Sequence, residues 1–530
     1  MYRLYPGRVL LKRPKPESVL AWAAAAVGVI GIASALTPEM ANRFDFVEGV
    51  LPPGVPNIAR WGALAFGISL VWLSRSLARR RRRAWQLAVG IVVASAAAHL
   101  AKGLDFEEAT ISLLLLVALV RFRRRFDVPG DPASVRPLFV IGLAAVAAAA
   151  VGVGVELRGG NVSDRFADLF DAIGFLAGFY ALFLWLRPLS HVVTQTVGDR
   201  RLVRELVDAY GRDSLSFFAL RRDKSFFFSP TRRAFLAYRV VGSSALVSGD
   251  PVGDEGEFDA LLFEFRRVAH ARGWRLAVLG ASEACLGTYR RLGMRAVPIG
   301  HEAVLRPDEF SLEGRAIRKV RQSVSRAVKR GYTFRVVAAD EADAELREQL
   351  GSVSDAWRGR QVERGFSMAM DDLYVEGTLF ALAEREGRVD GFLHLAPTVA
   401  CGGWSLSTMR RRPGATNGLT EFLVAELLAW AKEERVHEVS LNFCALTEFI
   451  SPERAVTVPR RLVRRVLLAG DRVFQLERLH SFNRKFFPEW RPRYLCVEKI
   501  SDLAVVGLAY LRVEQLLTPP RPFARKRVVA

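Results

Sequence analysis

The chain has 530 residues, of which 51% are hydrophobic, and it carries a formal net charge of +21. A composition that is both so apolar and so basic excludes a uniform soluble globule. It is reconciled if the apolar residues are concentrated in membrane spans while the positive charge faces anions. The four cysteines show no C-x-x-C pair and no zinc-ligand spacing, so the sequence predicts reduced thiols and no metal site. Nucleic acid, anionic lipid, or both are the expected partners.

Apolar stretches recur through residues 1–190. A spanning helix needs ~20 mostly apolar residues. The candidate spans are residues 18–36, 60–76, 84–100, 109–120, 137–157 and 166–186. The fourth is short by itself, and it either begins within residues 102–108 or enters the bilayer as a re-entrant segment. We therefore expect a transmembrane domain of about six helices over residues 1–190.

The charges between these spans predict their orientation, because Lys and Arg near span ends are retained on the cytoplasmic side. Basic clusters at residues 3–15, 79–83 and 121–125 alternate with acidic loops at residues 39–48 and 105–108. This alternation fits an even number of spans with both ends inside, in the plasma membrane. The arginine clusters act as topology signals, gather anionic headgroups, or do both.

After residue 188 the pattern changes to short strands and amphipathic helices separated by turns. The predicted strands are residues 217–220, 225–228, 235–241, 244–247, 275–279, 302–305, 379–383, 391–397, 404–409 and 438–443. Helices are predicted at 258–272, at a segment ending at 293, and at 418–433. A strand meander followed by helix, strand, helix and strand is the pattern of a GNAT-type acyltransferase, and it recurs. We expect an α/β (α+β) soluble domain with tandem GNAT-like units at 191–309 and 332–500.

The predicted linker between the units, residues 310–331, contains a basic amphipathic helix. Apolar residues recur there every three or four positions, and seven cations surround them without an acidic residue: Arg315, Arg318, Lys319, Arg321, Arg326, Lys329 and Arg330. The helix either packs as an ordinary solvated helix or contacts tRNA phosphates or the bilayer surface. A basic C-terminal tail is expected at 501–530.

Residues 410–418 run from a strand end through a Pro/Gly turn into a helix that begins near Leu419. A helix N-terminus offers unpaired N–H groups to an anion, so this turn predicts a phosphate cradle, although an ordinary loop fits equally well. Two further segments concentrate charged and aromatic side chains, residues 363–368 and 482–494. The second is either a packed cap or a site for a polyanion or acyl donor.

Several ordered segments together resemble the C-terminal domain of phosphatidylglycerol lysyltransferases, the multiple peptide resistance factor group. The matching residues are 214–229 (SLSFFALRRDKSFFFS), Gly249-Asp250-Pro251, 300–303 (GHEA), 310–314 (FSLEG), Arg321-Gln322, 363–368 (ERGFSM), Met409-Arg410-Arg411, Asn417-Gly418, 440–443 (SLNF), 482–486 (FNRKF), and Trp490, Pro492, Arg493 and Tyr494. The resemblance covers about residues 190 to 500. The membrane half also looks like that of actinobacterial relatives.

The resemblance implies transfer of an aminoacyl group from aminoacyl-tRNA to a hydroxyl of a membrane lipid such as phosphatidylglycerol. Such lysyl- or alanyl-lipids change the envelope charge and give resistance to cationic peptides. No cofactor is implied, and the charged tRNA is expected to come from a separate enzyme. The implied partners are aminoacyl-tRNA, an anionic membrane lipid and the bilayer, with a homo-oligomer also considered.

The resemblance also implies roles for particular residues. Arg410 would hold the terminal adenosine phosphate or the developing charge, and Lys485 would face the same phosphate. Glu363 and Asn417 would position the aminoacyl end. The predicted catalytic residues are thus Arg410, Ser407 and Glu363, and the predicted substrate-binding residues are Lys485, Asn417, Glu421, Arg493, Arg318, Arg321 and Phe366.

One residue departs from the family pattern. The family usually has an aspartate three residues before the arginine, in S-L-D-x-M-R, where this chain has Ser407. Serine forms hydrogen bonds but cannot neutralise the aminoacyl ammonium. A different donor, a substitute acid such as Glu421, and loss of activity all stay open.

Two other functions are therefore considered beside aminoacyl transfer. One is a membrane-tethered GNAT-like enzyme with another acyl donor, although the chain has no clear Q/R-x-x-G-x-G/A loop for coenzyme A. The other is a lipid transporter or flippase-like protein with a degenerate soluble half.

Overall fold

The computed structural model describes residues 16–36, 55–103, 106–129, 185, 193–359, 369–445 and 476–514. The chain forms two compact units, one with residues 1–190 and 270–274 and one with residues 191–269 and 275–530. The fifth predicted span lies outside the described residues, as does the sixth apart from Trp185. Glu363 and Phe366 also lie outside them.

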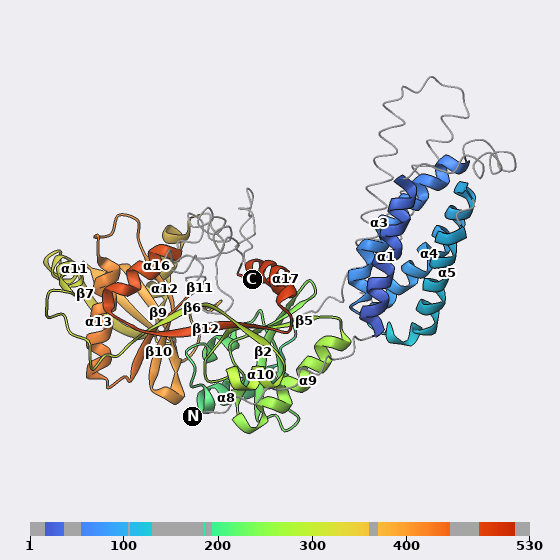
Figure 1. The fold of residues 1–530 in the computed structure, drawn as a ribbon. Coiled ribbons are helices and arrows are strands. Elements are labelled where there is room, and N and C mark those ends of the chain that lie inside the picture. Colours follow the sequence, from blue (N-terminus) through green and yellow to red (C-terminus); the bar gives the residue numbers. More distant parts are fainter. Residues whose placement is uncertain are drawn as a thin grey trace, which may run out of the picture. The chain divides into compact units, whose positions relative to one another are not determined.

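The described part of the first unit consists of helices that match the first four predicted spans (Figure 1). They are α1 (Pro16–Leu36), α3 (Val55–Leu77), α4 (Arg82–Gly103) and α5 (Phe106–Arg121). A Cβ atom on Gly28 would lie 2.6 Å from the carbonyl oxygen of Gly67, so these two glycines allow α1 and α3 to approach closely. By length and hydropathy, residues Pro16–Ser34 form one candidate membrane span, and Leu64–Leu77 is a shorter apolar helical stretch.

The second unit is built on one twelve-stranded sheet in the order β1-β2-β3-β5-β12-β6-β11-β10-β9-β8-β7, with β4 paired to β2. The strands are β1 (Ser225–Phe228), β2 (Ala234–Val241), β3 (Ser244–Ser248), β4 (Val252–Gly253), β5 (Arg275–Ala281), β6 (Arg295–Leu305), β7 (Thr333–Ala338), β8 (Leu379–Arg385), β9 (Arg388–Thr398), β10 (Gly403–Arg411), β11 (Glu438–Ala445) and β12 (Glu489–Val497). Two antiparallel series, β1-β2-β3 and β7-β8-β9-β10, are each followed by a strand that runs parallel to the last of the series. These parallel pairs are β3 with β5 and β10 with β11.

In chain order, β1 to β6 belong to the first half of the second unit and β7 to β12 to the second half. The strands β6 and β12 join these two halves. β12 comes from the end of the chain but pairs with β5 of the first half, and β6 comes from the first half but pairs with β11 of the second. β6 and β12 also pair with each other. The crossing of β12 through the centre of the unit is visible in Figure 1. The two halves therefore share backbone hydrogen bonds and form one continuous sheet.

Helices cover both faces of the sheet. They are α8 (Val197–Tyr210), α9 (Phe258–Ala271), α10 (Leu286–Arg291), α11 (Arg318–Lys329), α12 (Ala344–Arg358), α13 (Leu419–Glu433), α16 (Leu476–Asn483) and α17 (Leu503–Val513). α13 buries eight side chains, among them Phe422 and Leu427, in a core shared with α11 and strands β8 to β11. α12 packs Leu350 and Val353 against Phe380 and Phe392 in a separate core.

Two sequence predictions differ from the structure. Residues 217–220 were expected to form a strand but belong to the 3₁₀ helix η3 (Ser216–Leu220), whose five side chains are all buried. A short apolar run does not distinguish a buried strand from a buried helical turn. Residues 503–513, placed in a basic tail, form helix α17. The other strands are confirmed with shifts at their ends, as are the predicted helices over 258–272 and 418–433 and the basic helix in the linker.

Candidate functional site

The parallel strands β10 and β11 diverge in the middle of the second half. They pair only over Gly403–Ser405 with Glu438–Ser440, although both strands continue beyond these residues. At the same level β10 shifts its register against β9 after Leu406, and β11 shifts its register against β6 after Ser440. Both strands therefore bend where they part. We call this place the β10/β11 opening.

Asn442 bridges the two strands at the start of the β10/β11 opening. Its Nδ2 donates a hydrogen bond of 3.0 Å to the carbonyl oxygen of Leu406, and its Oδ1 accepts one of 2.9 Å from the backbone N–H of Phe443. Its φ is 66°, in the left-handed region that asparagine tolerates better than most residues. Asn442 thus provides both the backbone turn and the bridge.

Ser407 and Arg410 lie on the β10 side of this opening, and both are buried. The Oγ of Ser407 accepts a hydrogen bond of 3.0 Å from the backbone N–H of Met370. The residues that follow Met370 are tied to the first half, where the backbone N–H of Arg222 donates to Asp371 Oδ2. Arg410 lies opposite Phe392 on β9, with its guanidinium carbon 6.0 Å from the ring centroid. The hydrogen bond to Ser407 therefore fixes the backbone at Met370.

Several buried polar atoms on β9 and β10, the strand pair that contains Arg410, have no hydrogen-bond partner of standard geometry among the described residues. His394 is 0% exposed and faces Thr408 across the β9–β10 pair. Among the described residues, neither ring nitrogen of His394, nor the hydroxyl of Thr408 or Ser405, has a hydrogen-bond partner of standard geometry. Burial, and then the charge of Arg410, lowers the pKa of His394 to about 3, while Asp372 and the backbone of Leu373 oppose the shift. The imidazole is therefore neutral at pH 7, and Arg410 carries the positive charge here.

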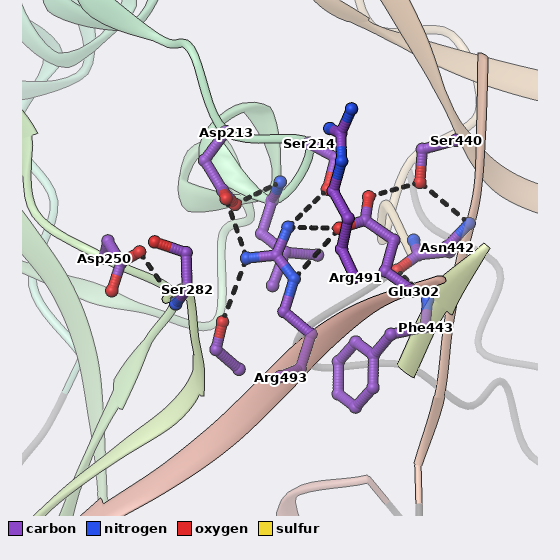
Figure 2. Close-up of polar contacts among 12 residues, drawn as sticks. Asp213, Ser214, Asp250, Ser282, Glu302, Ser440, Asn442, Phe443, Arg491 and Arg493 are labelled. Atoms are coloured by element: carbon purple, nitrogen blue, oxygen red, sulfur yellow. Dashed lines mark hydrogen bonds and ion pairs between the residues drawn. The ribbon is translucent and has the colours of Figure 1, made fainter. Parts of the chain in front are cut away.

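Arg493, at the centre of β12, is surrounded by acceptors (Figure 2). Its Nε and Nη2 donate to Glu302 Oε2, and its Nη1 donates to Asp213 Oδ2 at 2.7 Å. Nη2 also donates to Ser214 Oγ at 2.9 Å, and Nη1 to the carbonyl oxygen of Gly280 at 3.2 Å. Burial opposes the charged form, but Asp213 and Glu302 raise the pKa of Arg493 above its ordinary value. The guanidinium is thus saturated by protein groups.

A chain of hydrogen bonds leads from this arginine to the β10/β11 opening (Figure 2). Ser440 Oγ donates to the other oxygen of Glu302 at 2.5 Å and accepts from the backbone N–H of Asn442 at 3.0 Å. Asn442 in turn contacts Leu406, the residue before Ser407. From the sequence, Arg493 was expected to bind substrate. That role stays a prediction, and in the structure its N–H groups bind protein acceptors, among them Glu302 on β6.

The first half contains a similar opening between β3 and β5. These strands pair up to Ser248 and Leu279, and beyond them Asp250 accepts hydrogen bonds from the Ser282 N–H at 3.0 Å and from the Tyr289 hydroxyl at 2.8 Å. A cavity of about 610 Å³ lies here. Its charged lining residues are Asp213, Asp250, Glu255, Glu283, Glu302, Glu438, Glu489, Arg212, Arg491 and Arg493. We call it the acidic cavity, because carboxylates outnumber arginines.

The other predicted site residues fall into separate places. Lys485 and Glu421 form an ion pair of 2.7 Å between η7 (Arg484–Phe486) and α13, so the expected substitute acid already has a cation as its partner. Arg321 donates to the carbonyl oxygens of Leu312 and Gly314 and holds that loop. Arg318 is exposed on α11.

The N-terminus of α13, the predicted phosphate cradle, packs against α11. Arg326 Nη1 donates to the carbonyl oxygen of Asn417 at 3.0 Å. Gly418 has a φ of 94°, and a Cβ atom there would lie 2.6 Å from Ser323 Oγ. Only glycine fits both the backbone angle and this close approach. The Asn417 side chain is exposed beside this contact.

Four residues of these two openings were not expected as site residues from the sequence: His394, Asn442, Glu302 and Asp250. Three of them stand inside segments that carried the family resemblance: Asp250 in Gly-Asp-Pro, Glu302 in GHEA and Asn442 in SLNF. The signal for these three was therefore present. His394 has no such signal, because an isolated histidine in a strand does not differ from a core residue until its neighbours are known.

Comparisons with known proteins agree on the second unit, which we call the soluble unit. A family model described as "Phosphatidylglycerol lysyltransferase, C-terminal" matches residues 204–497. The lysylphosphatidylglycerol biosynthesis bifunctional protein LysX of Rhodococcus jostii is 39% identical over 360 residues, which cover 67% of this chain and 32% of that protein. LysX of Mycolicibacterium gilvum is 31% identical over 97% of this chain and 51% of its own length. The chain thus spans about a third to a half of these relatives.

Among solved structures, L-PGS from Bacillus licheniformis superimposes with a TM-score of 0.56 at 26% identity. The superposition covers 62% of this chain and all of that one. A C-terminal domain from Agrobacterium fabrum, titled as a lysylphosphatidylglycerol synthetase domain, gives a TM-score of 0.54 at 26% identity over 61% of this chain. Both superpositions cover a share of the chain that corresponds to the soluble unit.

Proposed function

Because the chain belongs to the family of phosphatidylglycerol lysyltransferase C-terminal domains, we propose that it is a membrane-bound aminoacyltransferase. It moves an aminoacyl group from aminoacyl-tRNA to a hydroxyl of a membrane lipid such as phosphatidylglycerol. One observation carries the proposal: the family match includes the β10/β11 opening, with Ser407 and Arg410 on one strand and Asn442 on the other. The named relatives, which make lysylphosphatidylglycerol, favour a lysyl group.

The reaction needs alignment more than activation, because an aminoacyl ester is already a good acyl donor. The lipid oxygen attacks the ester carbonyl carbon and forms the new C–O bond. The bond from that carbon to the tRNA ribose oxygen breaks, and the proton of the lipid hydroxyl ends on the ribose oxygen. The protein holds donor and acceptor together and stabilises the oxyanion formed at the carbonyl.

Arg410 is the residue suited to the negative charge of this reaction. It is buried, so a phosphate or oxyanion beside it interacts more strongly than it would in water. The neighbouring His394 is neutral and does not compete for the anion. In this proposal Arg410 binds the terminal adenosine phosphate or the developing oxyanion, and Glu363 and Phe366 complete the aminoacyl end.

Lys485 and Arg318 are proposed to contact tRNA phosphates. Lys485 is partly exposed, and Glu421 holds its ammonium group in place without burying it. Arg318 stands on the exposed side of α11, and the described part of that helix contains no acidic residue. Arg321 and Asn417 then act indirectly, through the loops that they hold or join.

Ser407 stands where the family usually has an aspartate, and its hydroxyl oxygen accepts a hydrogen bond from the backbone N–H of Met370. A hydroxyl offers the aminoacyl ammonium a neutral hydrogen-bond partner only. In this proposal the carboxylate of Glu363 supplies the countercharge.

The fold and the location belong to the same proposal. The repeated order of an antiparallel series and a diverging parallel pair supports two GNAT-like units that have exchanged their last strands, β6 and β12. The helices α1, α3, α4 and α5 support a membrane domain, with the soluble unit on the cytoplasmic side where charged tRNA is found. A homo-oligomer remains a prediction.

Lipid mass spectrometry on a host that lacks aminoacylated lipids tests the proposed activity. Expression of the full chain should produce a new aminoacyl-lipid, and Arg410→Ala and Lys485→Ala should abolish it. Arg267→Ala is the matched control, because Arg267 pairs with Glu264 on the exposed side of α9 and should leave the product unchanged. An unchanged lipid profile with the full chain present in the membrane would overturn the proposal.

Ser407→Asp separates an active enzyme from a degenerate one. The full chain in detergent is given charged tRNA and lipid vesicles, and transfer is measured for both forms. Transfer by the natural chain supports the proposed function. If only Ser407→Asp transfers, the natural chain is not the enzyme.

A further inference from the structure

Helix α17 (Leu503–Val513) follows the segment that the family model matches, which ends at residue 497. One side of the helix belongs to the core: Val506, Ala509 and Val513 are buried there, among side chains of the first half of the sheet. Their spacing of three and four residues marks one helical face. This face fixes α17 on the soluble unit (Figure 1).

Both ends of α17 are held by charged groups. Asp502, at its start, forms an ion pair of 2.9 Å with the Nε of Arg275 on β5, and the arginine side chain is buried. Glu514, at its end, is also buried, and its charge acts on the buried ammonium group of Lys224. The buried face and the Asp502–Arg275 ion pair therefore orient the helix on the soluble unit.

The outer side of α17 is apolar although it faces away from the core. Ile500 is 45% exposed, Val505 37% and Leu508 53%, and Ala504 is exposed between them. Ala504 and Leu508 lie one turn apart on α17, Val505 stands beside them, and Ile500 belongs to the 3₁₀ helix η8 (Ile500–Asp502) directly before α17; these exposed apolar residues form a stripe along the surface. A surface helix normally carries polar residues on this side. We call this feature the α17 stripe.

Cations surround the α17 stripe. Lys499 and Arg512 are exposed at its two ends. The sequence that follows the helix adds Arg521, Arg525, Lys526 and Arg527, and residues 515–530 contain no acidic residue. An apolar helical side bordered by Lys and Arg is the pattern of helices that lie in the plane of an anionic membrane surface.

We propose that α17 is an interfacial anchor: its apolar stripe lies in the headgroup region of the bilayer and seats the soluble unit on an anionic lipid surface. Lys499 and Arg512 then extend to lipid phosphates, while their stems cover the apolar edge. The chain would thus contact the bilayer at two places, through its N-terminal helices and through α17. This proposal concerns a contact surface and does not depend on the transfer reaction.

A second copy of the chain fits the stripe less well. In a two-fold symmetric pairing of two antiparallel α17 helices, Lys499 of one copy would approach Arg512 of the other. Like charges at both ends of such an interface oppose the pairing. An anionic lipid surface instead satisfies both cations and the stripe at the same time.

Photocrosslinking of the full chain in its membrane tests the proposal. Leu508 is replaced by p-benzoylphenylalanine, the membranes are irradiated, and mass spectrometry identifies what the side chain has captured. The matched control is the same replacement at Val399, which is 46% exposed on η5 (Val399–Cys401), the 3₁₀ helix between β9 and β10. We expect phospholipid adducts at position 508 and none at position 399.

Each other outcome of the crosslinking overturns the proposal. Capture of a second copy or of the chain's own N-terminal helices at position 508 would show that protein covers the stripe. No capture at 508, or equal lipid capture at both positions, would show that the stripe has no special contact with lipid. A thermal unfolding midpoint equal to that of the natural chain verifies that each replacement leaves the fold intact.

The charge argument has its own test in reconstituted vesicles. The full chain with the probe at position 508 is placed in phosphatidylcholine with or without phosphatidylglycerol. Lipid capture should be several-fold higher with the anionic lipid, and Lys499→Gln with Arg512→Gln should reduce it. Equal capture in both vesicles would overturn the anionic part of the proposal. None of these readouts requires transfer activity, so their failure is distinguishable from failure of the proposed function.

Discussion

The two openings in the sheet have the same strand geometry but opposite charge. At β3/β5, the acidic cavity is lined by seven carboxylates and three arginines, and Arg493 and Arg491 already pair with four of the carboxylates. At β10/β11, buried Arg410 lies near the neutral His394, and the same strand as Arg410 carries Ser405 and Thr408, whose hydroxyls have no hydrogen-bond partner among the described residues. The first opening is largely satisfied by its own side chains. The second retains unused hydrogen-bonding groups beside a positive charge.

This difference shows how one strand arrangement can serve two purposes. Buried polar groups are normally paired, and unpaired ones call for a reason such as a ligand or water. This criterion supports the proposal that an anionic substrate binds at the β10/β11 opening. The arginines at the β3/β5 opening are expected to hold the two halves together, because Arg493 of β12 pairs with Asp213 and Glu302 of the first half. Substitutions at the two openings test this assignment of roles. Their expected effects on the free energy of unfolding range from several kcal/mol at Arg493 to about 1 kcal/mol at Ser407.

Arg493→Leu should be the most destabilising of these changes. It leaves the buried Glu302 and the partly buried Asp213 without their counter-charge, and removing one partner of a buried ion pair typically costs about 3–5 kcal/mol. The thermal unfolding midpoint of the full chain in detergent measures the loss. The control is Arg267→Leu, which breaks an exposed ion pair and should leave the midpoint unchanged. Equal midpoints for the two variants would show that Arg493 does not support the sheet.

Lys224 predicts a pH dependence of stability at the β3/β5 side. Its Nζ donates to Phe218 O and to Ser248 Oγ, both at 2.7 Å, and burial lowers its pKa to about 7. Between this value and its unfolded pKa of about 10.5, the unfolded chain binds more protons, so stability rises with pH. From pH 7 to 9 the gain from this group is roughly 2 kcal/mol.

Lys224→Met removes the titrating group and should remove that gain. The difference between the natural chain and the variant, measured as unfolding midpoints over pH 7–9, isolates Lys224 from other titrating groups. Parallel pH profiles for both proteins would contradict the assignment.

Substitution of Asn442 should cause a smaller loss of stability, at the β10/β11 opening. Asn442→Ala removes the bridge to Leu406 and leaves alanine at a positive φ, whereas Asn442→Gly removes only the bridge. The Asn442→Ala variant should therefore be less stable than the Asn442→Gly variant by about 1 kcal/mol. Chemical denaturation of the three proteins gives the order. If the glycine variant is the less stable of the two, the backbone angle does not limit this position.

Ser407→Ala should have the smallest effect on stability. It breaks one hydrogen bond, to Met370 N–H, and should cost about 1 kcal/mol. Ser405→Ala is the matched control on the same buried strand, because Ser405 Oγ has no hydrogen-bond partner within the described part of the chain and its loss should not lower the unfolding midpoint. A greater loss from Ser405→Ala would reverse the roles given to these two serines.

Local patterns predicted much of the soluble unit. Short apolar segments bounded by turn residues marked strands such as β2, β9 and β10, and the three- and four-residue spacing marked α9 and α11. These signals depend on neighbours within one element, so they are present in the sequence. The resemblance motifs added Arg410 and Ser407, which the structure places together on β10.

The partners of the charged residues were not predictable in the same way. Arg493 was predicted to bind substrate, and its contact with Asp213, which lies 280 positions away in the sequence, became visible only in the structure. Glu421 was considered as a substitute acid, and the structure shows that Lys485, 64 positions away, is its partner. A charged side chain reveals its role only when the fold has brought its neighbours together.

The sequence by itself determined that the chain has apolar helices followed by an α/β unit, and where most strands lie, because these depend on hydrophobic periodicity. Only the tertiary structure decided that β6 and β12 change places, since several strand orders satisfy the same apolar pattern. It also decided that α17 is a helix with a buried side and an apolar exposed side. Residues 503–513 are apolar around the whole helix, so their periodicity does not show which side is inside.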